Sequence, residues 1–202
     1  MKRFFLLSIT MLMSVALLMT ACKKDKPQPD NSGNNGNTTP SQTIADNTVV
    51  YDGVTYHIDN VDVGYFHSEL TLIMATTNET LEDGSPLLTV DDIHISPNVW
   101  NRTYDMVDQS QWPDFSMLGL ILMGAVDLGY EGFCNGGTGT HGWLDGVSYE
   151  EGNIFSSGTY RVDGNNDGTP ITVTVDGTLI NGKTLKMKLV SGNYEINEYK
   201  SN

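Results

Sequence analysis

The chain has 202 residues, of which 25 are acidic and 11 are basic, and its formal net charge at pH 7 is −14. Five of the basic and two of the acidic residues precede position 44, so residues 44–202 carry six basic and 23 acidic residues and a formal charge of −17. Proteins bind nucleic acids and anionic head groups mainly through Lys and Arg. We therefore expect no nucleic acid partner and no direct binding to lipid head groups.

Residues 1–22 have the pattern of an export signal. Residues 2–3 are basic, residues 4–19 are mostly apolar, and two small residues precede Cys22. The apolar run is shorter than the roughly 20 residues that cross a bilayer as a helix, and a polar segment follows it. We therefore expect residues 1–21 to be a cleaved signal peptide, which leaves Cys22 as the new N-terminus.

The run Leu17-Leu18-Met19-Thr20-Ala21-Cys22 resembles the lipobox of bacterial lipoproteins. In that family the cysteine thiol receives diacylglycerol and the freed amine receives a further acyl chain such as palmitate, so the resemblance implies a lipid anchor at Cys22. Two or more acyl chains hold a protein stably on a membrane. The tract Lys23-Lys24-Asp25-Lys26 also resembles the export tags of Bacteroidota surface lipoproteins. It implies a location in the outer membrane, at the cell surface or in the periplasmic leaflet.

The segment after the expected anchor is rich in Pro, Gly, Asn, Ser and Thr. This composition is typical of disordered linkers, because it offers too few apolar side chains to form a core. We expect residues 22–43 to form the acylated cysteine and a disordered tether, and residues 44–202 to form a single folded domain. With Cys22 acylated, Cys134 is left without a partner for an intramolecular disulfide.

The first half of the domain shows strand patterns separated by turns. Asp52-Gly53 lies between the apolar residues of 49–51 and 54–58, and this dipeptide suits a type I′ hairpin turn because both central residues need positive φ. Residues 70–75, 89–96 and 117–126 are further expected strands. The last of these is a strongly apolar run that contains glycines, which suggests a bent central strand.

The second half shows the alternation expected of a half-exposed antiparallel sheet. Apolar and polar residues alternate along 171–179 and again along 184–190, and Asn181-Gly182 supplies the turn between them. Residues 155–162 precede this hairpin and residues 193–199 follow it, which predicts a four-stranded meander. Gly177 is an expected bulge.

About ten short strands in all predict an all-β fold, either an antiparallel sandwich or a closed barrel. The segment that includes Ser157-Gly158-Thr159-Tyr160 and Thr174-Val175-Asp176-Gly177-Thr178-Leu179 resembles the C-terminal meander of uncharacterised Bacteroidota lipoproteins. Some of those are similar to calycin-type barrels. The resemblance implies fold and lineage and carries no catalytic residues.

One loop has the opening half of a calcium-binding motif. Asp163, Asn165 and Asp167 place oxygen side chains at alternate positions before Gly168. The bidentate Glu that closes such loops is missing, since Thr174 occupies its position. A hairpin turn explains the same residues, and a weak structural Ca²⁺ site is the alternative. We expect no other cofactor.

Two glycine- or amide-rich stretches contain the best candidates for ligand binding. Residues 129–146 hold Tyr130 and Trp143, and a second expected loop holds Trp100 and Trp112. Aromatic rings stack on the apolar faces of sugars, while amides and carboxylates bind the hydroxyls. The alternative is that these large aromatics plug the ends of the core.

An enzymatic reading has less support. Cys134, His141 and Asp145 have the residue types of a cysteine hydrolase, but sequence proximity does not establish their geometry. Asp91-Asp92 and Glu150-Glu151 are expected on opposite strand faces or in loops, and to be solvated. We therefore expect a non-enzymatic, lipid-anchored binding module, with a glycan as one ligand class. A structural or assembly role in an envelope protein complex is the alternative.

Overall fold

The computed structural model describes most of the expected domain, namely residues 44–66, 70–95, 100–108, 116–134, 138–149, 153–165 and 167–196. These residues form 13 strands and belong to one compact unit. Among them no helix occurs that is long and apolar enough to cross a membrane. The predicted all-β class is confirmed, with 13 strands in the described part of the chain rather than about ten.

The smaller sheet has six antiparallel strands. In spatial order they are β2 (Val54–His57), β1 (Thr48–Tyr51), β13 (Thr184–Val190), β12 (Thr172–Leu179), β11 (Phe155–Asp163) and β6 (Arg102–Asp105).

The larger sheet has seven antiparallel strands. In spatial order they are β10 (Val147–Tyr149), β9 (Thr138–Leu144), β8 (Leu128–Cys134), β7 (Ser116–Gly124), β5 (Leu88–Ile95), β4 (Leu70–Thr76) and β3 (Asn60–Phe66).

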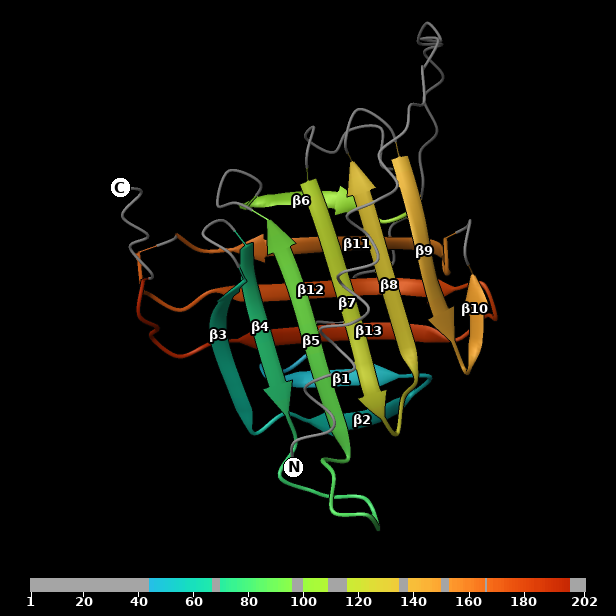
Figure 1. The fold of residues 1–202 in the computed structure, drawn as a ribbon, viewed down its shortest axis with the longest axis horizontal. Coiled ribbons are helices and arrows are strands. Elements are labelled where there is room, and N and C mark those ends of the chain that lie inside the picture. Colours follow the sequence, from blue (N-terminus) through green and yellow to red (C-terminus); the bar gives the residue numbers. More distant parts are fainter. Residues whose placement is uncertain are drawn as a thin grey trace, which may run out of the picture. The chain divides into compact units, whose positions relative to one another are not determined.

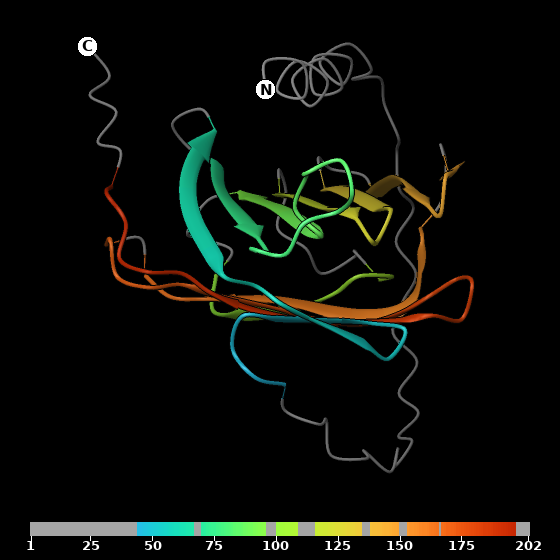
Figure 2. The ribbon, with the colours of Figure 1, turned by 90° about the horizontal axis from the view of Figure 1, so that it is seen from below.

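The two sheets pack face to face as a β-sandwich, and their strands run crosswise (Figure 1). Seen edge-on, they form two separate layers (Figure 2). The edge strands are β2 and β6 in one sheet and β3 and β10 in the other, so neither sheet closes on itself. Of the two architectures that the sequence allowed, the structure is therefore the sandwich and not the calycin-like barrel.

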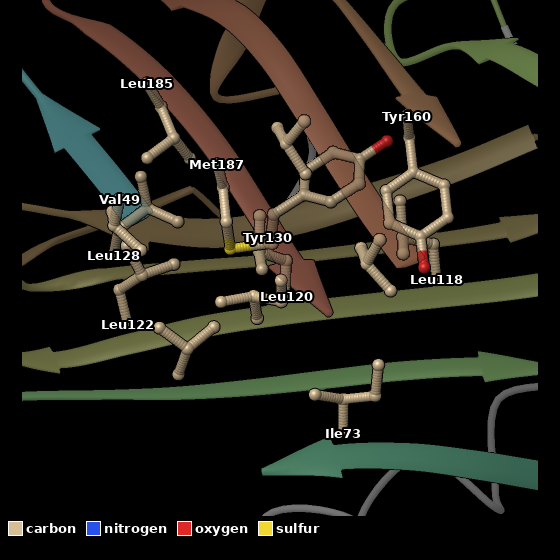
Figure 3. Packing of buried hydrophobic residues seen from close by; sticks show 14 of the residues in the cluster. Val49, Ile73, Leu118, Leu120, Leu122, Leu128, Tyr130, Tyr160, Leu185 and Met187 are labelled. Carbon is tan, nitrogen blue, oxygen red and sulfur yellow. The ribbon is translucent and has the colours of Figure 1, made fainter. Parts of the chain in front are cut away.

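The core lies between the two layers (Figure 3). Along β12 and β13 every second residue is buried, as the sequence alternation predicted. Val49 and Met187 from the six-stranded sheet face Leu120 and Leu128 of the seven-stranded sheet, and all four side chains are fully buried. Each such side chain stabilises the fold by about 1.5–3 kcal/mol, so this interface is the main source of stability.

A polar contact also joins the sheets inside the core. The hydroxyl of Tyr160 in β11 donates a hydrogen bond to Oδ2 of Asp92 in β5 at 3.0 Å, and both residues are buried. Burial, with a further contribution from Asp92, raises the pKa of Tyr160 well above its usual range. The expectation that both Asp91 and Asp92 are solvated was therefore wrong for Asp92, although the two residues do alternate between faces.

Several turns follow the predicted chemistry. Asp52 and Gly53 have φ values of 49° and 82° and connect β1 to β2, as expected for a type I′ turn. Gly182, with φ of 84°, lies in the turn between β12 and β13. Because the type of turn determines which residues pair in a hairpin, these turn residues determine the register of β1 with β2 and of β12 with β13.

Three details of the predicted strand pattern need correction. Residues 129–146 were expected as a loop, but residues 129–134 and 138–144 pair in the β8–β9 hairpin, with Gly129, Gly132, Gly139 and Gly142 inside the ladder. Residues 191–196 are not in a strand, so the fourth strand of the C-terminal meander does not begin at Asn193. The irregularity opposite the end of β12 lies in β11 between Phe155 and Ser157, and not at Gly177.

Candidate functional site

Trp143 lies on the outer surface of the seven-stranded sheet. Its neighbours in β9, Gly142 and Leu144, are buried on the core side, whereas Trp143 is only half-buried. Its indole ring lies over Gly129 of β8, its direct cross-strand partner. A Cβ atom at Gly129 would come within 2.2–2.4 Å of three ring atoms. The missing side chain of Gly129 therefore lets the ring lie close against the sheet.

A hydrogen bond fixes the orientation of this ring. Nε1 of Trp143 donates to Oδ1 of Asp127, which lies in the turn between β7 and β8, at 2.7 Å. A backbone hydrogen bond also links this turn to the turn after β9, since the amide of Asp145 donates to the carbonyl of Asp127 at 2.9 Å. Trp143 is thus held on one face by Gly129 and at its polar end by Asp127.

The strand register places Trp143 in a row that crosses the sheet. Asp91 in β5 pairs with Ile121 in β7, Ile121 pairs with Gly129, and Gly129 pairs with Trp143. Met74 in β4 extends the row on the other side of Asp91, and its side chain is 38% exposed. We call the outward-facing residues Met74, Asp91, Ile121, Glu131, His141 and Trp143 the outer platform.

Glu131 and His141 lie on the same outer face, two residues along their strands from Gly129 and Trp143. They are direct cross-strand partners, and Oε2 of Glu131 lies 2.5 Å from Nε2 of His141. This distance is that of an ion pair when the imidazole is protonated, and the oxygen is buried. Glu131 is 8% exposed although it points away from the core. The outer platform therefore includes a carboxylate that is shielded from water and fixed beside an imidazole.

Asp91 is a second carboxylate on this face that is partly shielded from water. It lies between Met74 and Ile121 on neighbouring strands, and it is half-buried. Burial raises the pKa of Asp91, and among the described residues no hydrogen bond or charged group offsets that effect. Within the described ranges, Asp91 is therefore a carboxylate whose hydrogen-bonding capacity is not used by the protein.

The other aromatic candidates occupy different environments. Trp100 is 3% exposed and Tyr130 is fully buried, and both belong to the core. The ring of Tyr130 meets Phe155 edge-on at a centroid distance of 5.2 Å, and its hydroxyl donates to the carbonyl of Met106 at 3.1 Å. These two aromatics have the positions expected of core plugs, and their rings are covered. Trp112 lies outside the described residues.

The oxygen-rich loop has the hydrogen bonds of a turn. The carboxylate of Asp163 pairs with the guanidinium of Arg161, and Oδ1 of Asp167 accepts a hydrogen bond from the amide of Thr169 at 3.0 Å. The backbone carbonyl of Asn165 accepts one from the hydroxyl of Tyr194 at 3.2 Å. In the described part of the chain, no group of three or more His, Cys, Asp or Glu side chains is placed to hold a metal ion.

Cys134 and His141, the candidate nucleophile and base of a cysteine hydrolase, lie far apart in the β8–β9 ladder. Cys134 pairs with Thr138, whereas His141 pairs with Glu131, so the two positions are three rungs apart along the hairpin. Three rungs correspond to about 10 Å. The side chain of Asp145 is committed to other partners, since its Oδ2 accepts hydrogen bonds from Lys183 at 2.7 Å and Asn181 at 3.1 Å.

The sequence pointed to Trp143 but not to the residues around it. Asp91 was read as solvated, and Glu131 and Asp127 were not singled out. One signal was available: Asp145-Gly146 repeats the turn dipeptide Asp52-Gly53, with φ values of 50° and 76°. Reading it as a hairpin turn would have suggested strand structure in the segment before it.

No family model, curated protein or solved structure matches this chain. The candidate site therefore has to be judged on its own chemistry.

Proposed function

We propose that this protein is a lipid-anchored, extracytoplasmic binding module that binds a glycan through the outer platform. The observation that supports this most strongly is the position of Trp143. Its ring is half-exposed, lies against Gly129 and is oriented by Asp127, so a ligand would not have to order it. A preorganised aromatic ring binds with a smaller entropic cost than a mobile one.

The chemistry around the ring suits a sugar. The apolar face of a pyranose stacks on an indole, and its hydroxyls donate to carboxylates at the edge of the contact. Asp91 supplies such a carboxylate on the same face of the sheet as Trp143, whereas Glu131 on that face is nearly buried beside His141. Met74 and Ile121 supply apolar surface on either side of Asp91. This combination favours a binding role over catalysis, which fits the proposal that the protein is not an enzyme.

The glycan-binding proposal is tested by affinity electrophoresis. The full-length protein in detergent is run on native gels that contain a panel of polysaccharides, beside the variants Trp143→Ala and Val54→Ala. Val54 is an exposed residue at the edge of the other sheet and serves as the control. We expect at least one polysaccharide to retard the protein and the Val54→Ala variant, but not Trp143→Ala. Equal mobility of all three proteins on every gel would contradict the proposal.

The membrane anchor is part of the same proposal. Cys22 carries the acyl chains, residues 22–43 form the tether, and the protein resides in the outer membrane with its domain at the cell surface. Replacing Cys22 by Ser should release the protein in soluble form, whereas a membrane-bound Cys22→Ser variant would refute lipid anchoring. Protease treatment of intact cells separates the two leaflets, since a domain at the surface is cleaved and a periplasmic one is protected.

A role in the assembly of an envelope protein complex is the second candidate. It is favoured by β2, an edge strand whose residues 54, 55 and 57 are exposed. Such an edge can pair with an extended segment of another protein. In this case Val54→Pro should abolish assembly with the partner while Trp143→Ala has no effect.

A further inference from the structure

We infer that the glycan recognised by the outer platform carries amino groups, so that the ligand is a cationic amino-sugar polymer rather than a neutral or acidic one. This inference rests on the proposed function and names the class of ligand for that site. It follows from the distribution of charge between the two sheets, the state of Asp91 and the spacing of the platform.

Charge is segregated between the sheets. The seven strands of the larger sheet contain no Lys or Arg, whereas their outward-facing residues include the acids Asp62, Asp91 and Glu131. All the Lys and Arg residues in the described ranges lie on strands of the six-stranded sheet or in its β12–β13 turn, namely Arg102, Arg161, Lys183, Lys186 and Lys188. The outer platform therefore lies in a field that repels uronic acids and phosphorylated sugars and attracts ammonium groups.

Asp91 is the specific point on the outer platform at which an ammonium group would bind. The carboxylate of Asp91 lies between Met74 and Ile121 and has lost part of its hydration, and none of the described residues donates a hydrogen bond to replace it. A sugar hydroxyl offers one neutral donor, but an ammonium group offers three donors and the opposite charge. Ammonium is thus the ligand group that best compensates a half-buried carboxylate. Glu131 differs, because His141 already lies against it.

The spacing requires an oligosaccharide. The ring of Trp143 lies over Gly129, and Asp91 is two strands away from Gly129 in the same row. Two strand spacings are about 10 Å, which is more than one pyranose ring covers. A chain laid across β5, β7 and β8 would place one sugar on Trp143 and an amino group of another at Asp91.

Isothermal titration calorimetry on the full-length protein in detergent tests this inference. The ligands are β-1,4-linked hexamers of glucosamine, N-acetylglucosamine, glucose and galacturonic acid. The variants are Trp143→Ala, Asp91→Asn and, as a matched control, Asp52→Asn. Asp52 has the same charge, is exposed in a turn of the other sheet, and has a positive φ that Asn tolerates.

The expected result is that the glucosamine hexamer binds best and the galacturonic acid hexamer does not bind. Asp91→Asn should weaken glucosamine binding about tenfold or more, as for the loss of a hydrogen bond between charged groups, and Asp52→Asn should leave it unchanged. If the glucose hexamer binds as well as the glucosamine hexamer and Asp91→Asn has no effect, the inference is wrong but the proposed function survives.

Two other outcomes are also decisive. Equal weakening by Asp91→Asn and Asp52→Asn would show that only the overall negative charge attracts the ligand, and this would overturn the inference. If no hexamer binds, or if Trp143→Ala binds as well as the unmodified protein, the glycan-binding proposal itself fails. The test thus separates a wrong ligand class from a wrong function.

Discussion

The outer faces of the two sheets differ in how closely they follow the ordinary rule for a sandwich. On the six-stranded sheet, the outward positions of β12 and β13 hold Thr, Asp and Lys side chains up to Lys188, with Val190 at the end of β13, and both Lys residues are paired with carboxylates. Lys186 pairs with Asp176 at 3.3 Å and Lys188 with Asp46 at 2.6 Å. This face has the polar character expected of a sheet surface that is exposed to water.

The seven-stranded sheet departs from that rule. Its outer face exposes Met74 and Met123, holds Trp143 against a glycine, and keeps the carboxylates of Asp91 and Glu131 partly away from water. Exposed apolar side chains and half-buried charges have a cost that solubility alone does not explain. The difference teaches that the two faces follow different rules, and the seven-stranded sheet is the one on which we propose the binding site.

The largest expected effect concerns the two glycines beneath the platform. A Cβ at Gly142 would lie 2.1 Å from the backbone carbonyl oxygen of Gly129, and no side-chain rotation can relieve that clash. At Gly129 the clash is with the ring of Trp143, which can swing away. We expect Gly142→Ala to lower the free energy of unfolding by about 3 kcal/mol or more, and Gly129→Ala by about 1 kcal/mol.

Urea unfolding measures both values, and tryptophan fluorescence reports the displaced ring in Gly129→Ala. Gly192→Ala is the control, since a Cβ there meets no atom within 4 Å. Equal stability of Gly142→Ala and Gly192→Ala would mean that β8 and β9 do not pack as closely as described. A Trp143 spectrum unchanged by Gly129→Ala would show that the ring does not depend on this glycine.

The next effect concerns the polar contact that joins the sheets. Tyr160→Phe removes the donor to the buried carboxylate of Asp92 and should cost about 1–3 kcal/mol. The pKa of Tyr160 is raised in the folded state, so the unfolded chain loses this proton first as the pH rises. The contribution of Tyr160 to the free energy of unfolding is therefore fully present below about pH 10, the ordinary pKa of tyrosine, and is lost as the pH rises above it.

Urea unfolding between pH 7 and pH 11 tests this linkage. The loss of stability above pH 10 should be smaller in Tyr160→Phe than in the unmodified protein. Tyr104→Phe is a suitable comparison, because the pKa of Tyr104 is also raised by burial but the residue lies on the edge strand β6. The same alkaline loss in the unmodified protein and in Tyr160→Phe would contradict the assignment.

The fold could be predicted where local signals are strong. Strict alternation and an Asn-Gly turn identified β12 and β13, and Asp52-Gly53 identified the first hairpin, because these features depend on near neighbours in the chain. The β8–β9 hairpin was missed because four positions of its strands are glycine, namely Gly129, Gly132, Gly139 and Gly142. A strand whose outward and inward positions are glycine shows no alternation, although its backbone pairs normally.

The candidate site could be predicted only in part. Trp143 was found because its residue type suits sugar binding, but its value as a platform depends on Gly129 in another strand. Asp91 joins the site only through three successive strand pairings, and sequence alone does not give those registers. The choice between sandwich and barrel was open for the same reason, since closure is decided by how the edge strands pair.

The smallest expected effects have opposite signs on the two outer faces. Lys186→Ala breaks an exposed pair with Asp176 and should lower the free energy of unfolding by about 0.5 kcal/mol or less. Asp91→Asn should instead raise the free energy of unfolding at pH 7, because the raised pKa of Asp91 means that its charged form disfavours folding. That contribution disappears below the pKa of the unfolded carboxyl, so the two proteins should converge in stability at about pH 3. Such a cost to stability is expected at a ligand contact, where function and stability are in conflict. If Asp91→Asn is destabilising at pH 7, Asp91 serves the fold and the contrast between the two faces is lost.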